Sequence, residues 1–170
     1  LQDEGSLRIE AIEPLTLSAE EFAQRISEQA AEHGTELVVI DGTEGYQLSL
    51  HGEPNGLVNS LHALTRYLTS TDITVVLIDQ SEGSGGMIQP TSRNFSYLAD
   101  NVVVLNYIER GGAKERVASV LKKRVGSHEE TVRPYTIEDD GIRMRDPVPE
   151  IEGFLSGQPE YGEGPDGRNS

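Results

Sequence analysis

Apolar residues recur at helical spacing in two stretches of the chain. Ser18 and Glu21 have the spacing of a capping box, and apolar residues follow at positions 22, 26 and 30. A helix is therefore predicted from about residue 18 to residue 33, and Gly34 supplies its end. Leucines at positions 57, 61, 64 and 68 predict a second helix.

Short apolar runs predict the strands of a sheet. Residues 7–12 alternate apolar and polar side chains, which is typical of a half-exposed strand. Nearly continuous apolar runs predict strands buried on both faces of a parallel sheet, and they cover residues 36–41, 73–78 and 102–108. Residues 115–124 and 132–137 predict antiparallel strands, and Gly141 predicts a turn. This order predicts an α/β fold, a mostly parallel sheet with helical crossovers followed by C-terminal antiparallel strands.

Polar, glycine-rich segments separate these elements. Residues 42–56 and 79–97 are predicted loops, and residues 82–86 form the tip of the second. Beyond residue 157 the composition buries too little apolar surface to order itself. We therefore expect one domain over residues 1–157 and a disordered tail over residues 158–170.

Acidic residues far outnumber basic ones. The chain has 29 Asp and Glu against 14 Lys and Arg, a formal net charge of −15, and only three of the cations are Lys. Binding to nucleic acid through a basic face is disfavoured, because it depends on many cations that release counterions. An acidic, lysine-poor surface suits a cytoplasm of high salt, where screening weakens self-repulsion, so a halophilic source is one expectation.

Several kinds of site and location are excluded or disfavoured by composition. The chain has no Cys, and its four His are too scattered for a metal motif. No apolar run approaches the roughly 20 residues of a membrane-spanning helix, and no signal peptide is recognised. We expect a soluble cytoplasmic protein that does not contact membranes. Because residue 1 is Leu and not Met, we also expect these residues to be cut from a longer polypeptide.

Positive charge is concentrated in one part of the chain. Six of the 14 Lys and Arg residues lie between positions 110 and 124. Side chains alternate along a strand, so Lys122 and Arg124 project together and Lys123 faces the other way. An ammonium beside a planar guanidinium suits phosphate oxygens, and His128 lies one Gly-Ser turn further on. The residues alone leave open a second interpretation, a solvated hairpin whose cations balance the acidic surface.

Asp41 stands at the end of a predicted buried strand, at the rim where open α/β sheets bind ligands. An ionised carboxylate is costly to desolvate unless it meets a cation, and Mg²⁺ held by one or two carboxylates and a phosphate is a natural partner. The alternative interpretation is an Asp that caps the following turn.

Five ordered motifs between residues 91 and 159 resemble the C-terminal half of KaiC-like ATPases of the RecA superfamily. They are S-x-L-A-D, Y-I-E, V-L-K-x-R-x-x-S-H, Y-T-I-x-D-D-G-I and G-x-L-S-G-x-P. With E-L-V-V-I-D-G at residues 36–42, the resemblance extends from residue 7 to residue 159. It implies part of a RecA-like P-loop NTPase fold. The acidity also fits the haloarchaeal relatives called HTR-like proteins.

The resemblance implies roles for particular residues. Asp41 matches the Walker B aspartate that organises Mg²⁺ around ATP, and would be a metal ligand. Lys122 and Arg124, with Ser127 and His128 near them, match groups that reach the nucleotide phosphates of a neighbouring subunit in KaiC-like rings. This is an arginine-finger arrangement, in which positive charge delivered from a neighbour stabilises the transferring phosphoryl group.

The chain also departs from the family. It contains no G-x-x-x-x-G-K-[ST] motif and no Gly-Lys pair, so we expect the P-loop in polypeptide upstream of Leu1. This chain alone is then not expected to hydrolyse ATP or to require a cofactor. Gln80, with Asp79, lies where relatives place a γ-phosphate sensor, although the residue types differ.

Two further substitutions bear on the family's regulation. Ser96 matches a phosphorylatable serine of the clock protein, but Tyr97 stands where its phosphorylatable threonine is expected, so the autophosphorylation cycle is not carried over. Val125 replaces the family's usual Gly before His128.

The leading hypothesis is the C-terminal part of a KaiC-like, HTR-like ATPase that binds ATP·Mg²⁺ between the subunits of a hexamer-like ring in a signalling or regulatory protein. One alternative is a degenerate, non-hydrolysing regulatory or oligomerisation module of a signal-transduction protein. Another is a recombinase-like DNA binder, which the glycine-rich loop at residues 83–86 favours and the acidity opposes.

The missing P-loop has a structural consequence. Its strand would lie between residues 73–78 and residues 102–108, so each of these strands loses a partner and exposes an edge. We expect the two strands to pair with each other, or the fragment to self-associate as a dimer or other oligomer.

Overall fold

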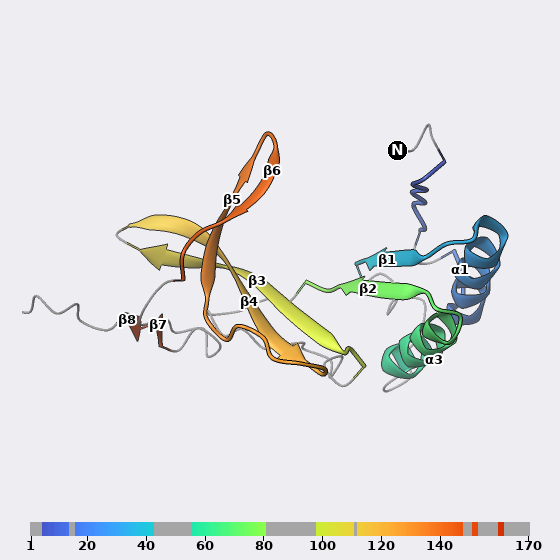
Figure 1. Cartoon of the computed structure of the whole chain (residues 1–170). Coiled ribbons are helices and arrows are strands. Elements are labelled where there is room, and N and C mark those ends of the chain that lie inside the picture. The colour runs from blue at the N-terminus through green and yellow to red at the C-terminus, as the bar shows by residue number, and fades with distance from the viewer. Residues whose placement is uncertain are drawn as a thin grey trace, which may run out of the picture. The chain divides into compact units, whose positions relative to one another are not determined.

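The structure is a computed structural model that describes residues 5–13, 16–42, 56–80, 98–110, 112–147, 151–152 and 160–161. The chain divides into two compact units, residues 1–80 and residues 81–170 (Figure 1). Each unit is described by itself.

The first unit combines two helices with a parallel pair of strands. Its elements are α1 (Ala19–His33), β1 (Leu37–Asp41), α3 (Gly56–Ser70) and β2 (Thr74–Ile78). The predicted capping box is confirmed, because Glu21 N donates to Ser18 Oγ at 3.2 Å and Ser18 N donates to Glu21 Oε2 at 2.7 Å. Gly34 ends α1 with a φ of 61°, a left-handed conformation that glycine adopts without strain. Both predicted helices are therefore confirmed.

The core of this unit lies between the helices and one face of the parallel pair. Its buried members come from all four elements or their ends: Ala30, Ile40, Leu64, Leu68 and Ile73. Val38, Val75 and Leu77 pack against this core. The parallel pairing runs from the Leu37–Thr74 pair to the Asp41–Ile78 pair.

The prediction that these strands are buried on both faces is wrong for this structure. Leu37 and Val39 in β1 are 53% and 52% exposed, and Val76 and Ile78 in β2 are 40% and 42% exposed. All four lie on the face opposite the helices, because side chains alternate along a strand. One face of the pair is therefore an open apolar surface.

The strand predicted at residues 7–12 is not formed. Residues 7–13 have no regular secondary structure, and Leu7 and Ile9 are exposed. The segment contacts α1 through polar side chains: Glu10 pairs with Arg25, and Arg8 Nη1 donates to His33 Nε2 at 3.2 Å. The alternating pattern was misleading because no neighbouring strand pairs with this segment in the described structure.

The second unit is built on an antiparallel sheet with strand order β3-β4-β5-β6. The strands are β3 (Asn101–Arg110), β4 (Ala113–Lys123), β5 (Arg133–Glu138) and β6 (Gly141–Met144). A short second pair joins β7 (Ile151–Glu152) to β8 (Glu160–Tyr161). The predicted α/β class, with a parallel part and C-terminal antiparallel strands, is confirmed.

β3 differs from its prediction as a fully buried strand. Ile108 is 3% exposed and packs with Val117 and Val132, whereas Val103 and Leu105 on the other face are 61% and 64% exposed. Within the second unit, β3 pairs with β4.

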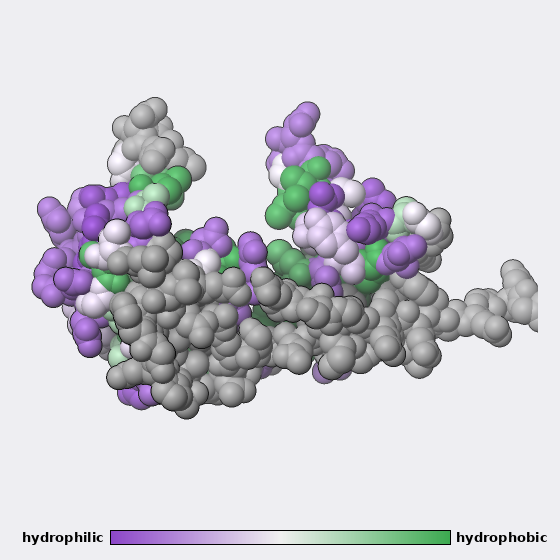
Figure 2. Space-filling view, turned by 180° about the vertical axis from the view of Figure 1, so that it is seen from behind, coloured by the Kyte–Doolittle hydropathy of each residue, from purple (hydrophilic) through white to green (hydrophobic). Residues whose placement is uncertain are grey.

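The exposed face of the antiparallel sheet is apolar and concave. It lines a cavity of about 430 Å³, whose walls include Leu105, Ile137, Ile142 and Met144. Figure 2 shows apolar surface on the hairpin that β5 and β6 form. We call this surface the sheet groove.

Several predicted segments fall outside the described residues. These are residues 43–55, residues 81–97 with Ser96 and Tyr97, and the predicted tail except for β8. None of the helices in the described residues is long and apolar enough to span a membrane.

Candidate functional site

Asp41 lies at the carboxyl end of the parallel pair. It is the last residue of β1 and the Cα partner of Ile78. Gly42 N donates to Ile78 O at 3.2 Å, which extends the ladder by one step, and Asp79 and Gln80 follow Ile78 directly. The structure therefore brings Asp41 and Gln80 to the same end of the parallel pair.

Asp41 is exposed at the end of its strand. Its side chain is exposed and belongs to the open face of the pair, with Leu37 and Val39. Within the described ranges, no group of three or more His, Cys, Asp or Glu side chains could hold a metal ion. A single carboxylate is nevertheless the donor set with which Mg²⁺ is often held when phosphate and water supply its other ligands.

A β-bulge determines which way the basic end of β4 points. Val103 pairs with Val120, but the next pair is Val102 with Lys122, so Leu121 has no partner in β3. Cross-strand partners share a face of the sheet. Val120 therefore lies on the groove face, and Lys122 lies on the opposite face with Val102. If the same residues paired without the bulge, Lys122 would be the partner of Asn101 and would project on the groove face, so the bulge re-aims it.

The two cations beyond the bulge contact the segment that precedes β3. Lys122 Nζ donates to the carbonyl of Ala99 at 2.8 Å. Arg124 N donates to the carbonyl of Asp100 at 2.8 Å, and Arg124 Nη1 lies 2.8 Å from Asp100 Oδ1. Thus the S-x-L-A-D and V-L-K-x-R motifs, about 20 residues apart in sequence, meet in space.

Asp100 was not among the predicted site residues. One pattern in the sequence could have indicated it: Asp100 directly precedes one strand and Arg124 directly follows the next, and such positions face each other when two consecutive strands pair antiparallel. Its partner could not be identified without the register, which the bulge changes by one residue.

A tight turn follows the cations. Gly126 has a φ of 81°, and Lys123 Nζ donates to the carbonyl of Ser127 at 3.2 Å. Ser127 is exposed and His128 is half-buried. Gly126 thus supplies the left-handed residue of the turn although Val125 replaces the family's usual glycine.

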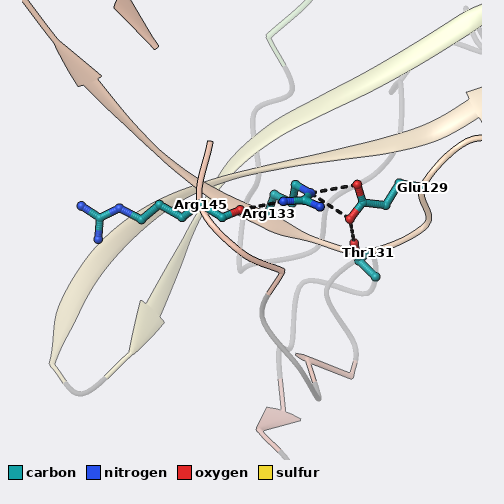
Figure 3. Close-up of polar contacts among 4 residues, drawn as sticks. All are labelled: Glu129, Thr131, Arg133 and Arg145. Carbon is teal, nitrogen blue, oxygen red and sulfur yellow. Dashed lines mark hydrogen bonds and ion pairs between the residues drawn. The ribbon is translucent and has the colours of Figure 1, made fainter. Parts of the chain in front are cut away.

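An ion pair closes the segment that links β4 to β5 (Figure 3). Arg133 Nε lies 2.8 Å from both carboxylate oxygens of Glu129, and its Nη1 donates to the carbonyl of Arg145 at 3.0 Å. Thr131 Oγ1 also donates to Glu129. The hydrogen bonds from Arg133 and Thr131 lower the pKa of the Glu129 carboxyl below its usual value. Ser127 and His128 are therefore carried on a segment that is anchored at both ends.

The candidate residues form two groups. Asp41 and Gln80 belong to the first unit. Lys122, Arg124, Ser127 and His128, which we call the basic cluster, belong to the second. An aspartate at the carboxyl end of a parallel strand, followed in sequence by antiparallel strands that carry paired cations, is the arrangement expected of a RecA-superfamily ATPase domain.

The particular family follows from a sequence profile. The KaiC ATPase profile matches residues 3–148, which is most of the chain, and the chain belongs to this family. It is 26% identical over 159 residues to the circadian clock oscillator protein KaiC of Thermostichus vulcanus, covering 94% of this chain and 30% of that protein. It is 25% identical over 164 residues to circadian clock oscillator protein KaiC 1 of Synechocystis, with the same coverage. The chain thus spans about 30% of the length of these relatives.

Proposed function

We propose that the chain is the Walker B and phosphate-contact part of a KaiC-like ATPase that binds ATP·Mg²⁺ between subunits. Asp41 would act at one nucleotide, while Lys122, Arg124 and the adjoining Ser127 and His128 would contact the phosphates of a neighbour's nucleotide. The observation that carries the proposal is that both cations contact the segment before β3: Lys122 Nζ donates to the carbonyl of Ala99, and Arg124 pairs with Asp100.

The chemistry of each group supports this division. Mg²⁺ bound with ATP neutralises the charge of the phosphates, and an exposed Asp41 carboxylate would hold it. Gln80, at the same end of the strands, would contact the terminal phosphate. The side chain of Arg124 is 57% exposed, so its guanidinium is accessible to a phosphate supplied by another subunit.

We propose that a P-loop comes from polypeptide outside this sequence, since the chain contains no Gly-Lys pair. Its strand would pair with the edge of β2, and the helix that follows it would cover the open face of β1 and β2, where Leu37, Val39, Val76 and Ile78 are exposed. The chain alone would then be inactive and would self-associate through the uncovered apolar surface.

The source and setting form a finer part of the proposal. A net charge of −15 with three Lys among 170 residues supports a halophilic source. We propose a haloarchaeal, HTR-like protein of the cytoplasm with a signalling or regulatory role. The same charge disfavours nucleic acid as a partner.

Mixed oligomers test the shared site. The protein is produced as this chain extended by a KaiC-family P-loop segment, in Asp41→Asn and Arg124→Gln forms. Each variant alone is expected to lose ATPase activity. Random mixing of equal amounts should restore about a quarter of the wild-type rate, because one in four head-to-tail interfaces joins an intact Asp41 to an intact Arg124.

The outcomes separate the proposal from its rivals. No recovery in mixed oligomers, shown to exchange subunits by a fluorescence label, would contradict action across the interface. Steady-state ATPase activity of this chain alone, above a buffer blank, would contradict the requirement for a P-loop. Arg143→Gln is the control, since Arg143 pairs with Glu138 and Asp140 outside the basic cluster.

A non-hydrolysing regulatory or oligomerisation module is the second candidate, favoured by the missing P-loop motif. It predicts that the natural polypeptide also lacks a P-loop and assembles equally well with and without ATP. Sedimentation velocity with and without ATP·Mg²⁺ distinguishes the two candidates.

A further inference from the structure

Arg124 has a carboxylate partner within its own chain. Asp100 Oδ1 lies 2.8 Å from Arg124 Nη1, and the two residues are also joined by the backbone hydrogen bond from Arg124 N to Asp100 O. The carboxylate therefore stands opposite Arg124 across the strand pair. Its place is determined by the sheet and by the bulge at Leu121, which brings Arg124 level with Asp100.

This ion pair is exposed. The side chains of Arg124 and Asp100 are 57% and 65% exposed. Pairs of this kind contribute little to stability, because water screens them and ordering two side chains costs entropy. A doubly charged phosphate offers a guanidinium a stronger partner than a single carboxylate does. The pair can thus open without unfolding the hairpin.

We infer that Asp100 is an intramolecular counter-ion of Arg124 that a phosphate group must displace, and that it lowers the affinity of the basic cluster for phosphate. This inference rests on the proposed function, in which the basic cluster contacts a neighbour's nucleotide. Asp100 is not a catalytic residue here. Its carboxylate offsets part of the positive charge of Arg124 until a nucleotide binds.

The sign of the effect follows from charge. A carboxylate beside the guanidinium repels an incoming phosphate, and repulsion between charges several ångströms apart at a protein surface corresponds to a factor of about three to ten in a binding constant. Asp100→Asn removes this repulsion but keeps an oxygen that can accept from Arg124 Nη1. If Asp100 only held the guanidinium in place, the same substitution would leave the affinity unchanged or reduce it.

The test is a titration of the full chain with inorganic tripolyphosphate, followed by the ¹⁵N NMR signals of the Arg124 side chain and of the amides of residues 122–128. Asp100→Asn is expected to bind at least about threefold more tightly than wild type. Asp140→Asn is the matched control, because Asp140 pairs with Arg143 at 2.7 Å with side-chain exposures of 67% and 61%. It is expected to match wild type, and Arg124→Gln is expected to weaken binding.

Unchanged or weaker binding by folded Asp100→Asn, with wild type binding at the basic cluster, overturns the inference and leaves the proposed function standing. If tripolyphosphate shifts these signals in neither protein, the phosphate-contact role in the proposed function fails, and the inference with it. The amide signals of β3 and β4 report whether Asp100→Asn is folded, and Asp100→Ser replaces it if it is not.

Discussion

Val39 and Ile40 are neighbours in β1 but lie on opposite faces of the parallel pair, and their exposures are 52% and 6%. Ile40 belongs to the core with Leu64 and Leu68, whereas Val39 belongs to the open face. Substitutions at Val39 and Ile40 therefore test the packing of the two faces of β1 separately.

Ile40→Ala is expected to lower the free energy of unfolding by about 2–5 kcal/mol, because it removes buried methyl groups and leaves a cavity. Val39→Ala is expected to change it by less than about 0.5 kcal/mol at protein concentrations low enough to keep the chain monomeric. Urea unfolding followed by circular dichroism measures both. Equal losses would show that the second face of β1 is covered in solution.

The open apolar surface predicts self-association of the isolated chain. Sedimentation velocity over a concentration series is expected to show dimers or larger species. Val39→Lys should shift the distribution toward monomer, because burying an unpaired ammonium is costly. A wild-type chain that stays monomeric throughout the series would contradict this prediction.

The N-cap of α1 predicts a local loss of stability. Ser18→Ala removes the hydroxyl that accepts from Glu21 N and is expected to cost about 0.5–2 kcal/mol. Ser70→Ala is the control, because Ser70 is the last residue of α3 and its hydroxyl donates to the carbonyl of Tyr67 instead of capping a helix N-terminus. Hydrogen exchange in the first turn of α1 should rise for Ser18→Ala alone.

The Glu129–Arg133 pair predicts a pH dependence. Hydrogen bonds from Arg133 and Thr131 hold the pKa of Glu129 in the folded chain below its usual value, so the stability that the pair contributes is present above that usual value and is lost as the pH falls through the folded-state pKa. Glu129→Gln is expected to lower Tm near neutral pH, and the difference from wild type should vanish in acid. Thermal melts across this range measure it. Glu130→Gln, at the exposed neighbouring position, is the control, and a pH-independent difference for Glu129→Gln would contradict the assignment.

The acidic composition predicts stabilisation by salt. Residues 1–80 hold 14 Asp and Glu and only three Arg. Raising KCl from about 0.1 M to about 1 M shortens the Debye length from about 10 Å to about 3 Å and weakens this repulsion. Tm is expected to rise, and hydrogen exchange should slow more in α1 than in β4. A Tm that falls with KCl would contradict the electrostatic argument.

Local signals in the sequence predicted the elements well. The capping box and Gly34 determine α1 through contacts within a few residues, so its bounds could be read directly. The position of Asp41 followed from its place directly after an apolar run, at the carboxyl end of a predicted strand. Both predictions depend on short-range chemistry.

Burial and face assignments were harder to predict. An apolar run shows that a strand can be buried, but whether Val39 or Leu105 is covered depends on what packs over it. The pairing of Arg124 with Asp100 depends on the register of two strands, and the extra residue at Leu121 leaves no mark in the alternation of β4. Asp100 was missed because its pairing depends on this register, which residues far apart in the sequence determine.

The bulge also affects how this chain is compared with its relatives. A relative that carries the same Lys-x-Arg letters but pairs β4 with β3 without the bulge would direct these cations onto the groove face of the sheet. Cations aligned between two such proteins would therefore face opposite sides of the sheet although their letters agree. The register of the two strands, and not only residue identity, decides whether these cations correspond between relatives.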